Sequence, residues 1–177
     1  MRSNNDKKWL QEYNDALLTS IGPTHMVTIN FRQPLPGGRE TRQKNLFIHL
    51  REWNREVLKA LFGRQFAIRN AHDDFLFIGI MEIGPFLQKE HVHLLVRVPE
   101  HLIPKFELHA ALLWKPRKIA MALGQQRTCL EPDIVIQRCA DYVRGPIGAI
   151  EYCTKRLTRN MDGVVWSCEF RNSGSNK

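Results

Sequence analysis

Apolar residues alternate with polar ones over some stretches of the chain and recur every three to four positions over others, which predicts a mixture of strands and helices. Alternation predicts strands at 25–33, 75–84, 91–99, 133–139 and 164–170, and it also favours a short edge strand at 66–70. Spacings of three and four predict helices at about 6–19, 43–62 and 105–122, and a last helix that begins near Pro146 and ends at about Arg159.

Strands and helices mixed in this order predict an α+β fold. We expect a central antiparallel sheet of about five strands, with helices packed mainly on one face and a late helix that bears a tyrosine. The pattern also predicts an N-terminal helical extension at 1–20, one folded domain at 21–170 and a disordered tail at 171–177. No apolar run approaches the length of a membrane-spanning helix, so we expect a soluble chain without a membrane partner.

The stretches FLFIGIMEIG and HVHLLVRVP follow each other closely, which predicts an antiparallel hairpin. Within the second stretch His91 and His93 share one face, while Val92 and Leu94 lie on the other. Any pairing that places Glu82 opposite either histidine puts all three polar side chains on one face. Two imidazoles and one carboxylate are a ligand set that suits a divalent metal ion.

Each of these three residues also has an ordinary structural interpretation. His91 and His93 could be polar residues on the solvent side of a strand, and Glu82 could be a charge at the rim of the sheet. The spacing of two histidines does not distinguish these interpretations, so the rest of the chain has to be considered.

The helix predicted after Pro146 has two different faces. Apolar residues lie along one side: Val143, Ile147, Ile150 and Leu157. A phenol and several cations lie on another side: Tyr152, Lys155, Arg156 and Arg159. Lys155 is placed to stabilise a phenolate or to neutralise an attacked phosphate, which makes Tyr152 a candidate nucleophile. The alternative is a half-buried tyrosine on a basic helix.

The chain is basic, with 26 Lys and Arg against 18 Asp and Glu, a formal charge of +8 and a pI of about 9.6. This excess favours a polyanionic partner such as nucleic acid, although a solvated basic surface would give the same count. The 4 cysteines contain no C-x-x-C pair, so we expect reduced thiols that serve packing.

Three stretches resemble, in the same order, the motifs of HUH endonucleases of the rolling-circle replication initiator (Rep) type. HMVTINF is similar to the first motif, a hydrophobic strand with Thr and Asn; EHVHLLV is similar to the second, His-hydrophobic-His; EYCTK is similar to the third, Tyr-x-x-Lys. The resemblance covers residues 24–159 and implies the ferredoxin-like HUH fold for the domain at 21–170. Tyr142 and Tyr152 are ten residues apart, so we expect a single catalytic tyrosine.

The resemblance implies a nickase that cuts and rejoins single-stranded DNA at a specific sequence or structure and thereby initiates rolling-circle replication of a plasmid, phage or virus. Glu82, His91 and His93 would hold Mg²⁺ or Mn²⁺ at the scissile phosphate. Tyr152, helped by Lys155, would attack that phosphate and form a 5′-phosphotyrosine. We expect further DNA contacts from the first motif and from scattered cations: Thr28, Asn30, Arg32, Arg97, Arg156 and Arg159.

The partners implied by the resemblance are single-stranded or hairpin origin DNA and host replication proteins. No G-x-x-x-x-G-K-[ST] loop occurs in the sequence, so we expect a separate helicase. The compartment implied is the cytoplasm of a bacterial host, or the host nucleus if the replicon is a eukaryotic virus.

Three other classes of protein share some of these features. A single-tyrosine HUH transposase usually has Gln four residues after its tyrosine, whereas position 156 is Arg. A noncatalytic nucleic-acid-binding module would usually show exposed aromatic residues on its central strands, and the His91 strand has none on its histidine face. A zinc-stabilised interaction protein needs four ligands, for which the cysteine spacing gives no support.

Overall fold

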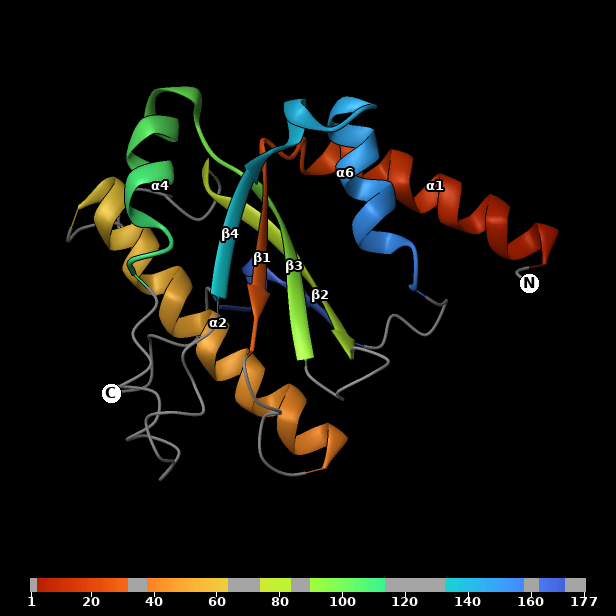
Figure 1. The fold of residues 1–177 in the computed structure, drawn as a ribbon, viewed down its shortest axis with the longest axis horizontal. Coiled ribbons are helices and arrows are strands. Elements are labelled where there is room, and N and C mark those ends of the chain that lie inside the picture. The colour runs from red at the N-terminus through yellow and green to blue at the C-terminus, as the bar shows by residue number, and fades with distance from the viewer. Residues whose placement is uncertain are drawn as a thin grey trace.

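The fold is α+β and is built around one antiparallel sheet, as the sequence predicts (Figure 1). The computed structural model describes residues 3–31, 38–63, 74–83, 90–113, 133–157 and 163–170. Its sheet has 5 strands in the order β4-β1-β3-β2-β5, and each neighbouring pair is antiparallel. The strands are β1 (His25–Asn30), β2 (Leu76–Ile83), β3 (Glu90–Arg97), β4 (Asp133–Arg138) and β5 (Val164–Trp166).

The α-helices of the described residues are α1 (Asn4–Ser20), α2 (Arg39–Phe62), α4 (Ile103–His109) and α6 (Gly145–Thr154). Short 3-10 helices are η1 (Glu100–Leu102), η3 (Cys139–Asp141) and η4 (Ser167–Phe170). Local chemistry sets two of the helix ends. Ser3 caps α1 by accepting a hydrogen bond from the backbone N–H of Asp6. Gly63 ends α2 with φ 84°, a conformation that favours glycine.

Helices α2 and α4 pack against one face of the sheet. The alternate residues Val92, Leu94 and Val96 of β3 point to this side and pack against the apolar stripe of α2. Trp53 lies fully buried in this core and donates from Nε1 to the carbonyl oxygen of Ala110, just after α4. Because these side chains face α2, the alternate residues His91 and His93 of β3 face the opposite side of the sheet.

The opposite face of the sheet is covered by α6, with α1 packed beside α6 (Figure 1). Met26, Ile80 and Leu95 make a second core with these helices. Between the helices, the Thr154 hydroxyl donates to Asn14 Oδ1 at 2.8 Å, and both residues are buried. Helix α6 is thereby held over the same face of the sheet that carries the histidines.

The structure revises three predicted element boundaries. The helix expected at 105–122 is α4 at Ile103–His109, and residues after 113 up to 132 lie outside the described part of the chain. The strand expected at 164–170 forms only 164–166 and continues as η4, because Ser167 turns inward and accepts from the Phe77 backbone N–H. The tyrosine helix ends at Thr154 rather than at Arg159. The edge strand expected at 66–70 and the tail at 171–177 lie outside the described residues.

Among the described residues, no helix combines the length and the apolar character that crossing a bilayer requires.

Candidate functional site

Glu82, His91 and His93 lie together on the α6 side of the sheet, as the hairpin predicted. Strands β2 and β3 pair in a register that places Glu82 directly opposite His91. Nε2 of His91 lies 3.1 Å from Oε2 of Glu82, and the two imidazole rings are 5.0 Å apart. One potential ligand atom from each of the three residues lies within 4.8 Å of the others. The group could therefore hold a metal ion.

Buried polar atoms without hydrogen-bond partners support the possibility that a metal ion binds here. Glu82 and His93 are buried, with 5% and 2% of their surfaces exposed. Oε1 of Glu82 and Nε2 of His93 have no hydrogen-bond partner among the described residues. Buried polar atoms without partners are costly, so they commonly mark a place where a ligand or ion supplies the missing bond. Two imidazole nitrogens and one carboxylate oxygen also leave coordination positions open for other ligands.

His93 is kept in the neutral form that a metal ligand requires. The pKa of His93 is lowered to about 4, mainly by burial and in smaller part by electrostatic interaction with His91 and Lys155. At neutral pH the ring therefore has one nitrogen with a proton and one with a free lone pair. Nδ1 of His93 lies 3.1 Å from the hydroxyl of Thr28, which faces it across the β1–β3 pair.

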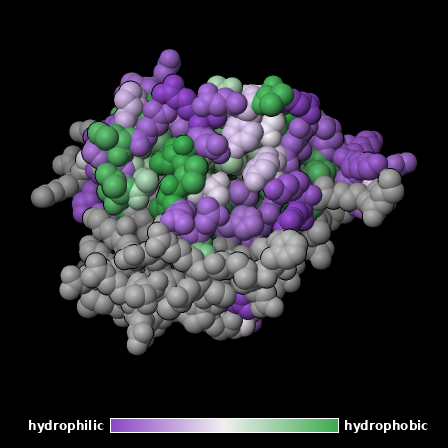
Figure 2. All heavy atoms as spheres, viewed as in Figure 1, coloured by the Kyte–Doolittle hydropathy of each residue, from purple (hydrophilic) through white to green (hydrophobic). Residues whose placement is uncertain are grey.

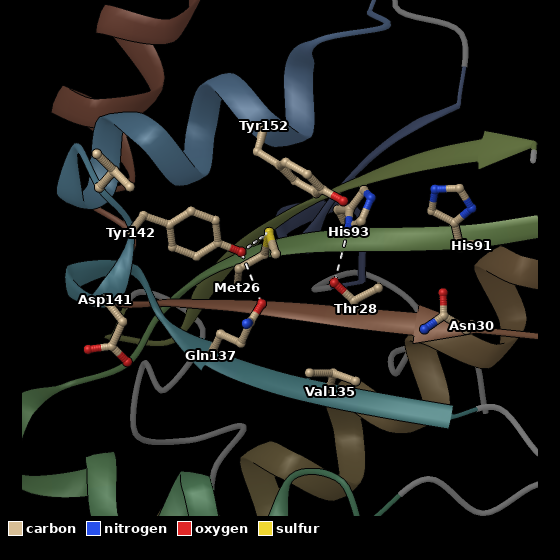
Figure 3. A pocket seen from close by; sticks show the side chains of 11 residues that line it. Met26, Thr28, Asn30, His91, His93, Val135, Gln137, Asp141, Tyr142 and Tyr152 are labelled. Carbon is tan, nitrogen blue, oxygen red and sulfur yellow. Dashed lines mark hydrogen bonds between the residues drawn. The ribbon is translucent and has the colours of Figure 1, made fainter.

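Tyr152 lies over the histidine pair (Figure 3). Its ring packs edge-to-face on the His93 ring, with the centroids 5.2 Å apart. Nζ of Lys155 lies 3.6 Å from the centre of the Tyr152 ring, a cation–π contact. Helix α6 thus brings a phenol and an ammonium group, both predicted from the Tyr-x-x-Lys spacing, to the edge of the candidate metal site. Tyr152 as a residue remains 45% exposed.

A groove of about 650 Å³ contains these residues and extends across the sheet (Figure 3). At one end lie His91, His93 and Asn30, and at the other end lie Tyr142 and Asp141. The remaining lining residues are Met26, Thr28, Val135, Gln137, Val143 and Tyr152. The groove is open to solvent along its length, which suits an extended polymer better than a small enclosed ligand.

The far end of this groove is formed by Tyr142 together with residues of β1 and β4 that no sequence motif indicates as part of a site. The Tyr142 hydroxyl donates to Gln137 Oε1 at 3.0 Å and also lies 3.2 Å from the sulfur of Met26. Burial raises the pKa of Tyr142 to about 12, so this phenol keeps its proton. The alternation of 133–138 already indicates that Val135 and Gln137 share a face, but only the pairing of β4 with β1 places that face beside the histidines.

The other residues predicted to contact DNA lie in different parts of the structure, and only some of them line the groove. Asn30 lies opposite His91 on β1 and lines the groove. Arg97, at the far end of β3, lines a second pocket with Thr24 and Pro99. Arg156 lies near the carboxylate of the candidate metal site, with Nη1 3.8 Å from Oε2 of Glu82. Arg32 and Arg159 lie outside the described residues.

The surface around the groove is chemically mixed. In Figure 2, hydrophobic side chains show over the β4 and α4 part of the molecule, beside a more polar surface over α6. Of the exposed apolar residues, Val135 lines the groove, whereas Leu108 lies on α4 and Leu112 just after it. Nucleobases present flat apolar faces and phosphates present charge, so a mixed surface of this kind is compatible with a single strand.

Comparisons of this chain with protein-family models, with curated proteins and with solved structures found no match.

Proposed function

We propose that this protein is a metal-dependent endonuclease of the HUH type, which nicks and rejoins single-stranded DNA through a covalent tyrosine intermediate and so initiates rolling-circle replication. The single observation that carries the proposal is the contact of Tyr152 with His93, 5.2 Å between ring centres, in a groove open to solvent. This contact places a candidate nucleophile beside a candidate metal-binding group. A noncatalytic nucleic-acid-binding module would not need the two groups to be adjacent.

The residues suit phosphoryl transfer. Glu82, His91 and His93 are the residues that would hold a divalent ion, Mg²⁺ or Mn²⁺, and such an ion would supply Lewis-acid polarisation of the scissile phosphate. Tyr152 would attack phosphorus through its oxygen: the Tyr152 O–P bond forms, the P–O3′ bond breaks, and the phenolic proton is ultimately taken up by the departing 3′ oxygen. The phosphate stays attached to the 5′ end of the downstream strand, and reversal of the step rejoins the DNA.

Lys155 has an electrostatic role in this scheme. Its ammonium group lies over the Tyr152 ring, close enough to stabilise negative charge that develops on the phenol or on the attacked phosphate. Helix α6 is packed against the sheet through core residues such as Ile150, and the Tyr152 ring is positioned by its contacts with His93 and Lys155.

The proposal is tested by covalent capture. The protein is incubated with Mn²⁺ and a pool of labelled single-stranded and hairpin oligonucleotides, and the products are separated by denaturing electrophoresis. We expect a protein–DNA adduct that maps to Tyr152 by peptide analysis and that disappears in Tyr152→Phe, which keeps the ring and removes the nucleophilic oxygen.

Tyr142→Phe is the matched control, since it removes a phenolic hydroxyl from the same groove and leaves Tyr152 intact. We expect it to retain adduct formation. Strand binding without any adduct in the unaltered protein would contradict the nuclease and favour a noncatalytic binding module. An adduct that persists in Tyr152→Phe would contradict the choice of tyrosine.

A further inference from the structure

Arg156 and His91 share one oxygen of the Glu82 carboxylate. Oε2 of Glu82 lies 3.1 Å from Nε2 of His91 and 3.8 Å from Nη1 of Arg156. Glu82 Oε1, in contrast, is buried and has no hydrogen-bond partner among the described residues. The arginine therefore stands at the candidate metal site, although its sequence position suggested only a contact with DNA.

The two ends of this ion pair have very different surroundings. The Glu82 side chain is 3% exposed, whereas the Arg156 side chain is 52% exposed. A buried carboxylate gains from any nearby positive charge, because little water is present to solvate it. The half-exposed guanidinium can leave at small cost, because water solvates it well and a surface ion pair contributes little to stability. The two partners thus differ: the Glu82 side chain is held in a buried position, whereas the Arg156 side chain can leave Glu82 and pair with another anion.

A divalent ion at Glu82, His91 and His93 would compete directly with Arg156. The ion would bring two positive charges to the same carboxylate, and a guanidinium within a few ångströms would repel it. Arg156 lies just beyond the end of α6, and its partner Glu82 lies 3.1 Å from His91, which lines the groove. A guanidinium displaced from Glu82 can therefore turn to a phosphate in that groove, which it can bind with two parallel hydrogen bonds.

We propose that Arg156 is an exchangeable counter-ion that couples metal binding to strand binding. In the metal-free protein it pairs with Glu82; when metal and strand are both bound it pairs with a strand phosphate. This inference rests on the proposed function, because it takes the strand and the metal as the ligands of the groove. Thermodynamic linkage then requires each ligand to raise the affinity for the other by the same factor.

The coupling is measured in a Tyr152→Phe background, in which no turnover consumes the DNA. Mn²⁺ affinity is determined by electron paramagnetic resonance, with and without a saturating short single-stranded oligonucleotide of mixed sequence. We expect the oligonucleotide to tighten Mn²⁺ binding by about tenfold in this parent, a factor within the usual range for coupled sites. In Arg156→Gln we expect Mn²⁺ alone to bind several-fold more tightly and the oligonucleotide to add less than about twofold.

Arg144→Gln is the matched control. Arg144 precedes the first residue of α6, its side chain is 62% exposed, and it also pairs with a glutamate, Glu151, at 2.7 Å. The control removes the same charge without touching Glu82, so we expect both the Mn²⁺ affinity and the coupling factor of the parent. A general effect of lost positive charge would change both variants equally and would overturn the proposal.

The remaining outcomes separate this inference from the proposed function. Equal Mn²⁺ affinity in the parent and in Arg156→Gln would show that Arg156 does not compete for Glu82. Tighter Mn²⁺ binding with an unchanged coupling factor would show that it does not transfer to the strand. Either result overturns the inference and leaves the nuclease standing. Failure of the parent to bind Mn²⁺ would overturn the metal site itself, and with it both proposals.

Discussion

Thr28 and His93 are joined across two paired strands, with the threonine hydroxyl 3.1 Å from Nδ1 of the imidazole. Nε2 of the same ring is buried and has no hydrogen-bond partner among the described residues. If Nδ1 donates its proton to Thr28, the lone pair on Nε2 is left for a metal ion. Thr28 was predicted as a DNA contact, and its observed position suits it to fix the tautomer of His93.

Removing the Thr28 hydroxyl should weaken metal binding. In Thr28→Val the side-chain shape is kept but the oxygen that hydrogen-bonds to Nδ1 is lost, so we expect Mn²⁺ affinity to fall by about tenfold or more. Thr28→Ser keeps the oxygen and should restore most of the affinity. The ¹⁵N chemical shifts of the His93 ring report its tautomer directly. Identical tautomer populations and Mn²⁺ affinities in Thr28→Val and the unaltered protein would contradict this role.

Mn²⁺ should raise the melting temperature through Glu82. An ion that binds only the folded state stabilises that state according to its concentration relative to its dissociation constant. Glu82→Gln keeps the size of the side chain and removes a strong metal ligand, so we expect the Mn²⁺-induced rise in Tm to vanish. Glu56 is also buried but lies on α2, away from the candidate metal site, so Glu56→Gln is the control and should keep the Mn²⁺-induced rise in Tm. A full Mn²⁺ response in Glu82→Gln would remove Glu82 from the ligand set.

Acidification should destabilise the protein through His49. Burial lowers the pKa of His49 from 6.5 to about 4. Between pH 6.5 and pH 4, His49 is therefore mostly protonated in the unfolded chain and mostly neutral in the folded chain. The free energy of unfolding therefore decreases as the pH falls from 6.5 towards 4, by about 3 kcal/mol at most from this residue. Urea unfolding in EDTA should show a flatter pH dependence in His49→Leu. The exposed substitution His101→Gln should leave the dependence unchanged, and equal slopes for all three proteins would refute the assignment.

Close packing of β2 against α2 should make Gly79 intolerant of a methyl group. A Cβ at this position would lie 2.9 Å from Cδ2 of Leu94 and 3.7 Å from Cδ1 of Leu50. We expect Gly79→Ala to lower the free energy of unfolding by about 1 to 2 kcal/mol, since overpacked cores are strained. Combining it with Leu94→Ala should cost less than the sum of the two single changes, because the new methyl group occupies the vacated space. Additive costs would show that the two sites do not clash.

The strongest predictions from the sequence concern short-range patterns. Two-residue alternation predicted that His91 and His93 share a face, and the hairpin brought Glu82 opposite His91. These inferences succeed because strand geometry fixes the direction of every side chain, and because strands that lie so close in sequence usually pair with each other. The Tyr-x-x-Lys spacing placed Lys155 beside Tyr152 for the same reason, now on a helix.

The parts of the site that the sequence did not predict depend on long-range packing. Thr28 meets His93 only because β1 pairs with β3, and 65 positions separate the two residues in the chain. Arg156 lies just beyond the end of α6, where the turn after Thr154 directs it towards Glu82 instead of along the helix. No local period encodes either contact, because both require the sheet order and the docking of α6 to be known.

The alternation of β1 and β4 has a consequence for how this protein can diversify. Val27 and Ile29 point into the α2 core, while Thr28 and Asn30, which alternate with them, line the groove. On β4, Val135 and Gln137 likewise line the groove, while Ile134 and Ile136 pack against the core. The side chains that stabilise the α2 core thus alternate along each strand with side chains that line the groove, so Thr28, Asn30, Val135 and Gln137 can change during evolution without repacking the α2 core.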